Sequence, residues 1–436
     1  MEHLRTLHAV SAVSGQLDPD PGRRRMPLMS PTPPRNMLGA YGAWAAARTE
    51  AAPLPLSFRN PSWTDLAAWK EKARAAVNGL LMSPPGTRAG DVQVHSREVH
   101  DGLLVEELSW QLPYGPRTEA IFLKPAAARG RLPAILGLHD HAGNKHFGKR
   151  KIVRAGRKVH PLMQRHHEEY YGGLGWADEI ARRGFAVLVH DVFPFESRRI
   201  RAGDLPGYVV DRLVSPPDQA RELTPEDLAS PAGGEHRDVP PGEPADRVAA
   251  YNAFASQHEA VVAKSLFCAG LTWPGVMVAD DRAALDYLAS RPDVDPGRLG
   301  CGGLSGGGLR TVFLAGLEER IRCAVCAGAM TTWRDFLLNV SYTHTWMIYV
   351  PGLPNLMDFP EMLAMRAPLP SMILATTADP LYTRAETERA GRILEETYRK
   401  AGAPDALRVH FHEGPHKFDR AMQEQAFAWW ERWLTP

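Results

Sequence analysis

The residues with the clearest chemical potential surround Ser305, in the run GLSGG at positions 303–307, which has the form G-x-S-x-G. An apolar, strand-like segment precedes this run, and a helix-like segment follows it over residues 307–317. A sharp strand-to-helix turn forces the serine into an unusual backbone conformation, for which the flanking glycines leave room. The turn also places the hydroxyl at a helix N-terminus, where free N–H groups favour a developing anion. We therefore interpret Ser305 as a nucleophile.

A serine nucleophile needs a general base, and the base needs a carboxylate that orients it. His416 follows the strand-like run LRVHFHEG, and Asp379 follows SMILATTA, so both are expected at the carboxyl ends of strands. Their order along the chain, serine then acid then histidine, is the order that accompanies such a turn. The sequence therefore predicts His416 as the base and Asp379 as the acid. Asp335, which follows the strand-like run CAVCAG, is the alternative acid.

An oxyanion formed beside Ser305 would need two backbone N–H donors. One is expected from Gly306, directly after the nucleophile, and the other from the loop after PAILGLHD, at His141 or Ala142. We also expect aromatic side chains to line an acyl or alcohol pocket, and the candidates are Trp273, Trp333, Trp346 and Tyr349.

The elements that must position these residues alternate along the chain. Helices are expected from Ser62, with that serine as N-cap, and later over 176–183, 278–290, 307–317, 383–400 and 422–434, the last with Trp433 in the core. Strand-like runs begin near residue 92 with three segments separated by turn signals, and continue at 133–140, 185–191, 299–305, 323–328, 371–379 and 407–414. This alternation predicts an α/β fold with a mostly parallel sheet that helices cover on both faces.

The chain divides by composition into an arm and one large domain. Residues 1–60 are rich in Pro, Arg and Ala and predict an extended N-terminal arm with a short helix near Trp44, through which copies of the chain could form a homo-oligomer. Residues 61–436 form the α/β domain, with a basic, His-rich insertion at 142–172 and a charged, Pro- and Gly-rich insertion at 196–245. Both insertions leave the carboxyl ends of strands, where open α/β sheets place their sites. Arginines 198, 199 and 201 are expected either near the mouth of the site or in solvent.

The overall composition excludes several classes of protein. The chain has 436 residues, of which 44% are hydrophobic and 23% charged, so it is neither disordered nor fibrous. The formal net charge is +1, so the chain lacks the excess of basic residues that is typical of nucleic-acid-binding proteins. No run of 18 apolar residues is present, and the N-terminus lacks the apolar region of a secretory signal, so we expect a cytoplasmic protein without a membrane span.

Cysteine and histidine clusters raise the alternative of a metal or redox centre. Cys323 and Cys326 form a CxxC, but a strand would point them to opposite faces, so we interpret them as buried small hydrophobic residues. Histidines gather at 139, 141, 146, 160, 166 and 167, beside Glu168, although their spacing matches no compact zinc motif. We therefore expect no metal and no cofactor, and a histidine pair on a solvated helix.

Longer stretches resemble a known family. Over residues 62–434 the chain resembles the α/β-hydrolase superfamily. The stretches that carry this resemblance are LGLHDHAGNKHFGK, GWADEIARRGFAVLVHDVF, RAALDYLASRPDVDPGRLGCGGLSGGG, VPGLPNLMDFPEM, and ADPLY followed by GPHKF. Within it, the closest resemblance is to dienelactone-hydrolase-like and acetyl-xylan-esterase-like serine esterases. The resemblance implies an eight-stranded sheet and hydrolysis of a small carboxylic ester through an acyl-enzyme, with Ser305, His416 and Asp379 as the triad. True dienelactone hydrolases have a cysteine nucleophile, where this chain has Ser305.

Other functions stay open from the sequence. G-x-S-x-G-G also occurs in prolyl-oligopeptidase-like enzymes, but the first 90 residues are too short for the propeller domain that those enzymes carry. A serine peptidase or aminopeptidase without a propeller is therefore the main alternative. A metal-dependent hydrolase and a binding protein that lacks catalysis are the others.

Overall fold

A central sheet organises the chain, and within the described residues it has nine strands in the order β1-β2-β3-β5-β4-β8-β9-β10-β11. The computed structural model describes residues 35–50, 53–214, 232–233 and 243–435, and contacts group Asn36–Pro436 into one unit. The strands of the sheet are β1 (Gly90–His100), β2 (Leu103–Gln111), β3 (Thr118–Pro125), β4 (Leu132–Gly137), β5 (Ala186–His190), β8 (Val294–Leu304), β9 (Ile321–Ala327), β10 (Ser371–Thr376) and β11 (Leu407–His412).

The strand directions confirm the predicted mostly parallel sheet. Strands β5, β4, β8, β9, β10 and β11 run parallel to one another, while β1, β2 and β3 pair antiparallel, and β3 also pairs antiparallel with β5. The expected number of eight strands was wrong by one. The additional strand is β1, which pairs with β2 at the edge and leaves most of its residues exposed.

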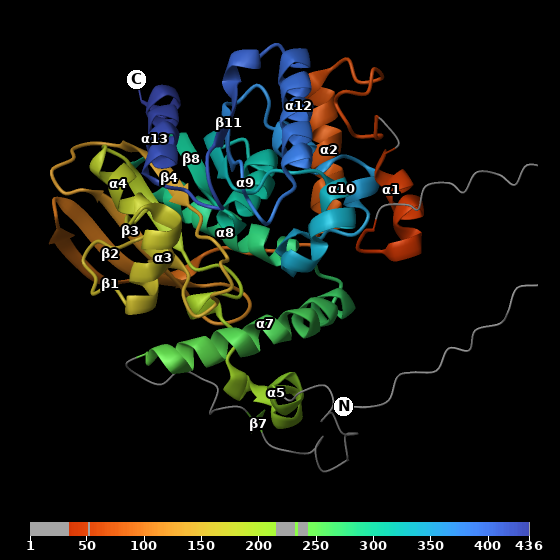
Figure 1. Ribbon diagram of the computed structural model, residues 1–436. Coiled ribbons are helices and arrows are strands. Elements are labelled where there is room, and N and C mark those ends of the chain that lie inside the picture. The colour runs from red at the N-terminus through yellow and green to blue at the C-terminus, as the bar shows by residue number, and fades with distance from the viewer. Residues whose placement is uncertain (1–34, 51–52, 215–231, 234–242, 436) are drawn as a thin grey trace, which may run out of the picture. The chain divides into compact units, whose positions relative to one another are not determined.

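Helices cover both faces of the sheet, as predicted (Figure 1). One face packs against α2 (Leu66–Leu81), α8 (Trp273–Ser290), α9 (Gly306–Leu317) and α12 (Arg384–Lys400), and the other against α4 (Trp176–Arg182) and α13 (Arg420–Leu434). Cys323 and Cys326 are buried on β9 and belong to different sides of the sheet. The alternation along β9 therefore separates the two thiols, as the strand interpretation required.

Two local expectations from the sequence need correction, and a third is confirmed. The cap of α2 is Asp65, whose carboxylate accepts hydrogen bonds from the N–H groups of Ala67 and Ala68, so the predicted Ser62 cap is wrong. An aspartate at this position caps the helix because it satisfies free N–H groups of the first turn. Trp433 is 36% exposed and lies at the rim of α13, while Trp430 is fully buried. The Ala-rich stretch forms α1 (Gly42–Glu50), as predicted.

The second insertion contains several short elements and leads into a long helix. Helix α7 (Ala245–Cys268) follows α5 (Gly207–Val214) and the short pair β6 (Leu205–Pro206) and β7 (Ala232–Gly233). Residues 215–231 and 234–242 of this insertion lie outside the described residues, as do residues 1–34 of the predicted arm and the oligomer contact assigned to it. No single helix in the described ranges is long and apolar enough to cross a membrane; α7 and α8 pass that test only as a pair bent by 85°.

The arginines after β5 do not provide charge at a site mouth. Arg198 is buried, contacts Asp280 at 3.4 Å, and donates to the carbonyl groups of Tyr114 and Pro116. Arg199 donates to the Glu196 carbonyl at 3.1 Å, and the exposed Arg201 is the one that faces solvent. The expectation of a place at the site mouth or in solvent was therefore wrong for Arg198, because its guanidinium is buried against Asp280 and two carbonyl groups.

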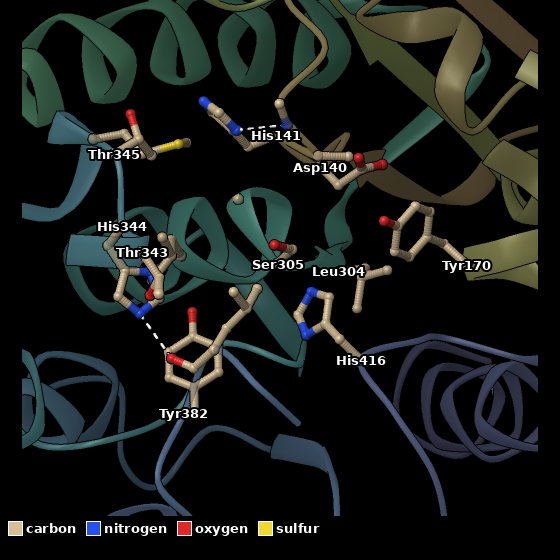
Figure 2. A pocket seen from close by; sticks show the side chains of 16 residues that line it. Asp140, His141, Tyr170, Leu304, Ser305, Thr343, His344, Thr345, Tyr382 and His416 are labelled. Carbon is tan, nitrogen blue, oxygen red and sulfur yellow. Dashed lines mark hydrogen bonds between the residues drawn. The ribbon is translucent and has the colours of Figure 1, made fainter. Parts of the chain in front are cut away.

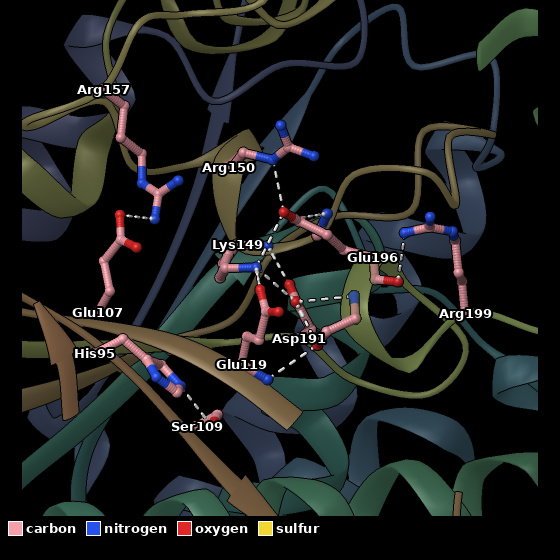
Figure 3. A network of polar contacts seen from close by, with 12 residues as sticks. His95, Glu107, Ser109, Glu119, Lys149, Arg150, Arg157, Asp191, Glu196 and Arg199 are labelled. Atoms are coloured by element: carbon pink, nitrogen blue, oxygen red, sulfur yellow. Dashed lines mark hydrogen bonds and ion pairs between the residues drawn. The ribbon is translucent and has the colours of Figure 1, made fainter. Parts of the chain in front are cut away.

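The basic 142–172 insertion is folded around its charges, which lie inside the protein. Its helix α3 (Pro161–Tyr171) follows the short 3-10 helix η2 (Lys149–Lys151). The Lys149 ammonium is buried and contacts three carboxylates, those of Glu119 at 2.9 Å, Asp191 at 2.8 Å and Glu196 at 3.0 Å (Figure 3). Arg150 adds a second cation to Glu196 at 2.6 Å. Segments from β3, η2 and the loop after β5 are thereby tied together.

Burial makes this network sensitive to the loss of any member. Burial alone would lower the pKa of Lys149, but the three carboxylates around it raise that pKa above its ordinary value. Burial also favours the neutral form of Glu196, and the nearby cations Lys149 and Arg150 hold its pKa well below the usual range instead. The charges are therefore stable inside the protein because they are paired, and an unpaired partner would carry a large desolvation penalty.

Replacement of Lys149 by methionine should therefore destabilise the fold strongly. Lys149→Met leaves the buried carboxylates of Asp191 and Glu196 without their shared cation, and we expect a loss of about 3–5 kcal/mol in the free energy of unfolding. The control is Arg384→Met, which removes an exposed pair with Glu388 and should cost less than about 0.5 kcal/mol. Urea denaturation measures both, and equal losses would contradict the structural role of the network.

Candidate active site

Ser305 stands at the junction of β8 and α9 in a strained backbone conformation. Its φ of +56° and ψ of −118° are unusual for a residue with a side chain, as predicted for a sharp strand-to-helix turn. The turn is held because the Ser305 N–H donates to Ala327 of β9 at 2.9 Å, and the Ser305 carbonyl accepts from Leu309 of α9 at 2.8 Å. The strain therefore persists because the neighbouring strand and the helix fix both sides of the residue.

The glycines around Ser305 are required by a close backbone contact. A Cβ atom at Gly303 would lie 2.1 Å from the Leu138 carbonyl oxygen, and one at Gly307 would lie 2.0 Å from the same atom. Neither distance admits a side chain, so the turn around Ser305, which we call the elbow (residues 303–307), can approach the end of β4 only if both positions are glycine. This contact brings Ser305 beside the loop that begins at His139.

Two backbone amides meet at this approach, as the oxyanion prediction requires. A Cβ atom at Gly306 would lie 2.9 Å from the His141 nitrogen, which places the two backbones side by side. Among the described residues, the amides of Gly306, His141 and Ala142 have no hydrogen-bond acceptor. Ala142 has a φ of +43°, so the loop bends sharply at this point. The arrangement leaves donors free to bind an anion beside Ser305.

His416 lies between Ser305 and an aspartate. Its Nδ1 atom is 2.6 Å from the Asp379 Oδ2 atom, and both side chains are almost fully buried. The second ring nitrogen, Nε2, is buried and has no hydrogen-bond partner in the described residues. Figure 2 shows the His416 ring directed toward Ser305, with Tyr170 and Tyr382 nearby. The structure therefore brings together the three residues that the sequence singled out.

The alternative acid, Asp335, is engaged elsewhere. Its Oδ2 atom accepts hydrogen bonds from the Thr331 hydroxyl at 2.7 Å and from the Thr383 N–H at 3.0 Å. Its Oδ1 atom accepts from the Asn339 amide at 3.0 Å. Through these contacts, the Asp335 carboxylate holds the loops after β9 and β10 together. Asp379 is the aspartate that contacts His416.

A small cavity of about 250 Å³ opens above Ser305. Its apolar lining consists of Leu304, Leu309, Met347 and Leu381, while polar groups come from the loops after β4, β9 and β10. Burial lowers the pKa of His344, whose Nε2 atom lies 2.9 Å from the Leu381 carbonyl. Burial, with Glu169, raises the pKa of Tyr170 to about 12. At neutral pH Tyr170 and His344 are therefore uncharged and can form hydrogen bonds. Asp140, which also lines the cavity, is ionised, because the neighbouring His166 and Lys151 outweigh its burial and lower its pKa.

Several residues of this wall could not be found from the sequence. Tyr170 lies at the end of α3, and Thr343, His344 and Tyr382 lie in the segments after β9 and β10. None of them belongs to a recognisable motif, and only the folded chain places them beside Ser305 (Figure 2). Loop residues carry no periodic signal, and their place depends on which strands are neighbours.

The structure places the four predicted aromatic residues outside this cavity. Trp273 is buried against Phe193, and Trp346 contacts Phe267 and the Tyr349 ring. Trp333 and Tyr349 line a separate apolar pocket that includes residues of α1. Their assignment to the Ser305 pocket was wrong, because Trp273 packs in the core at the start of α8, and the chain after β9 turns the other three rings into the core or toward α1.

The histidines of the first insertion are paired with carboxylates and carbonyl groups. The imidazole of His141 contacts Glu259 at 3.0 Å, that of His146 contacts Glu243 at 3.0 Å, and that of His166 contacts Asp140 at 3.2 Å. No group of three or more His, Cys, Asp or Glu residues within the described ranges could hold a metal ion. His166 and His167 are buried on α3, so the expectation of a solvated pair was wrong.

Comparisons with known proteins agree with this fold. Residues 245–436, which contain all three candidate catalytic residues, match the profile of the Prolyl oligopeptidase family. The chain is 24% identical over 366 residues to the protein named "Putative hydrolase YtaP" of Bacillus subtilis (strain 168), covering 84% of this chain and 100% of that one.

Solved structures show the same fold at low sequence identity. A "putative acetyl xylan esterase" from Bacteroides fragilis NCTC 9343 aligns with a TM-score of 0.60 and 16% identity, over 86% of this chain and 82% of that one. A glucuronoyl esterase from Solibacter usitatus aligns with a TM-score of 0.54 and 15% identity, over 88% and 99% of the two chains. These structures show that the chain has the fold of the α/β-hydrolases, and residues 245–436 are similar to the Prolyl oligopeptidase family.

The contact at the elbow predicts a large difference between two glycine substitutions. Gly303→Ala forces a methyl group against the Leu138 carbonyl, so we expect it to lower the free energy of unfolding by about 1–3 kcal/mol. Gly79→Ala on α2 meets no atom within 4 Å and should be neutral or stabilising, because alanine favours a helix. Thermal and urea denaturation of the two variants compare them directly. An unchanged Gly303→Ala protein would show that the elbow can relax.

Proposed function

We propose that this protein is a serine hydrolase that cleaves a carboxylic ester through an acyl-enzyme, with Ser305, His416 and Asp379 as its catalytic triad. The observation that carries the proposal is the orientation of His416. One ring nitrogen contacts Asp379 at 2.6 Å, and the other is buried, unpartnered and directed toward the strained Ser305. This is the arrangement that a general base needs.

In the acylation step, the Ser305 Oγ atom attacks the ester carbonyl carbon and its proton passes to His416 Nε2. Asp379 keeps the Nδ1 proton on the opposite side of the ring, which fixes the tautomer and stabilises the imidazolium. The carbonyl oxygen becomes an oxyanion, which the amides of Gly306 and of His141 or Ala142 bind. The C–O bond then breaks, and His416 returns its proton to the departing alcohol.

In the deacylation step, water replaces the alcohol. His416 takes a proton from this water, whose oxygen attacks the acyl carbonyl carbon and forms a second oxyanion at the same amides. Collapse of this intermediate breaks the bond to Ser305 Oγ, which regains a proton from His416. The products are one carboxylic acid and one alcohol, and the enzyme returns to its starting state.

The size of the cavity favours a short acyl group. Sites that enclose a drug-sized ligand measure roughly 300–1,000 Å³, and the cavity above Ser305 measures about 250 Å³. A small acyl group fits against Leu309 and Met347, while the alcohol part of the substrate would extend outward. The esterase names of the structural neighbours support an ester as substrate, and acetyl xylan esterase is the name that agrees best with a short acyl group.

A serine peptidase is the second candidate. The match of residues 245–436 to the Prolyl oligopeptidase family favours it, because peptidases of this kind use the same triad to cleave an amide. An amide has a poorer leaving group than an ester, so the two candidates differ in the substrates that they turn over at a useful rate.

Ser305→Ala should abolish turnover of short p-nitrophenyl esters. Removal of the nucleophile from an intact triad lowers kcat by roughly 10⁶-fold. The wild-type protein and the variant are compared on acetyl, butyryl and octanoyl esters, and on p-nitroanilides of single amino acids and of dipeptides. We expect Ser305-dependent hydrolysis of the acetyl ester, weaker hydrolysis of the octanoyl ester, and little hydrolysis of the amides.

Circular dichroism of Ser305→Ala provides the control for folding. Near-full ester hydrolysis by a folded Ser305→Ala protein would refute the mechanism. Rapid Ser305-dependent cleavage of the anilides, with slow cleavage of the esters, would favour the peptidase.

The identity of the acid is tested by two matched substitutions. Asp379→Asn removes the carboxylate that contacts His416 and should lower kcat by about 10⁴-fold, because the imidazole then takes the wrong tautomer. Asp335→Asn keeps a side chain of the same shape among its threonine and asparagine partners and should lower kcat by less than tenfold. Steady-state kinetics on the acetyl ester distinguish the two, and the reverse order of effects would assign the acid to Asp335.

A further inference from the structure

Lys151 is a fully buried lysine directly behind the loop that follows β4. Its Nζ atom donates hydrogen bonds to the carbonyl oxygens of Asp140 and His141, both at 2.8 Å. The ammonium also lies 4.6 Å from the centre of the Phe195 ring. The mechanism described above does not use this cation, although it is anchored to the two residues that begin the candidate oxyanion loop.

The geometry of the peptide bond connects Lys151 to the free amides. In a planar trans peptide, the C=O of one residue and the N–H of the next point in opposite directions. The Asp140 carbonyl shares its peptide plane with the His141 N–H, and the His141 carbonyl shares its plane with the Ala142 N–H. Because Lys151 binds both carbonyl oxygens from one side, both N–H groups are directed to the other side, where His141 and Ala142 line the Ser305 cavity.

We propose that Lys151 is a positioning residue for the oxyanion hole: its ammonium holds the two peptide planes after Asp140 so that their N–H groups face the anion formed at Ser305. This inference rests on the proposed function, which it extends to a residue without direct contact with the substrate. The charge contributes as well as the geometry, because a cation at the carbonyl end of a peptide strengthens the N–H at its other end as a donor.

Other contacts of the loop agree with a need for restraint. Ala142 has a φ of +43°, a conformation that a residue with a side chain keeps only when its surroundings impose it. On the opposite side of the loop, Glu259 of α7 contacts the His141 imidazole at 3.0 Å. Burial lowers the pKa of Lys151 to about 8, although Asp140 opposes this effect, so the side chain is mostly an ammonium ion at pH 7.

The neighbouring Lys149 provides a matched control for the test. Both lysines lie in η2 and are buried, and Lys149→Met and Lys151→Met remove the same group two residues apart. Lys149 contacts carboxylates away from the oxyanion loop. With p-nitrophenyl acetate, we expect Lys151→Met to lower kcat per folded molecule by 10- to 100-fold with KM changed less than threefold. We expect Lys149→Met to change kcat per folded molecule less than threefold despite its lower stability.

Chemical rescue separates positioning from a general structural role. Lys151→Ala leaves a space in which ethylammonium can replace the lost ammonium and its N–H donors. We expect ethylammonium to raise the kcat of Lys151→Ala at least tenfold. Tetramethylammonium, which has the charge but no N–H group, should not raise it. Lys149→Ala serves as the control and should show no increase in kcat per folded molecule with either ion.

The role of Lys151 and the proposed function predict different experimental failures. In the first case, the wild-type protein has a higher kcat than Ser305→Ala, but Lys151→Met has the same kcat per folded molecule as the wild type or loses no more of it than Lys149→Met does. This result would refute the role of Lys151 and leave the triad intact. If wild type shows neither Ser305-dependent ester turnover nor labelling of Ser305 by a fluorophosphonate, the proposed function is refuted, and this inference with it.

Discussion

The approach of two backbones at Leu138 is the contact on which the site depends. Gly303 and Gly307 meet the Leu138 carbonyl oxygen so closely that a side chain at either position would overlap with it. This contact sets the end of β4 against the turn between β8 and α9. It thereby places the amides of Gly306 and His141 next to Ser305 before any substrate is present. Donors fixed in advance in this way need no reorganisation when charge develops.

Buried charge secures the same region from behind. The short helix η2 carries Lys149 into a cluster of three carboxylates and Lys151 to the carbonyl groups of the oxyanion loop. The basic segment around η2, which the sequence suggests is a solvated loop, lies inside the protein and holds neighbouring segments together through its buried lysines. Paired buried charges contribute little net stability compared with apolar packing, but they enforce one arrangement, because any other would leave an ion unpaired.

Much of the framework follows from the sequence, because it rests on local signals. Ser305 is located by the glycines around it and by its place between a strand and a helix. Asp379 and His416 are located because they follow apolar, strand-like runs. All nine strand-like runs form strands of the sheet, including the edge strand that the family resemblance did not imply. The contacts that were missed join distant parts of the chain. Lys149 meets Glu119 and Asp191, and Arg198 meets Asp280, so only the folded sheet reveals that these side chains point inward.

Helix α7 has a consequence for the exchange of segments between relatives. Its Glu259 contacts His141, and its Asn252 accepts from the His146 N–H at 3.0 Å and donates to the Asn144 side chain at 2.8 Å. Helix α7 is thus joined to the loop after β4 and to the first insertion through complementary side chains. Loop grafting that moved α7 alone would leave these partners unmatched beside the site. A chimera would have to inherit the loop after β4 and α7 together, and the pair can be regarded as one unit of evolutionary change.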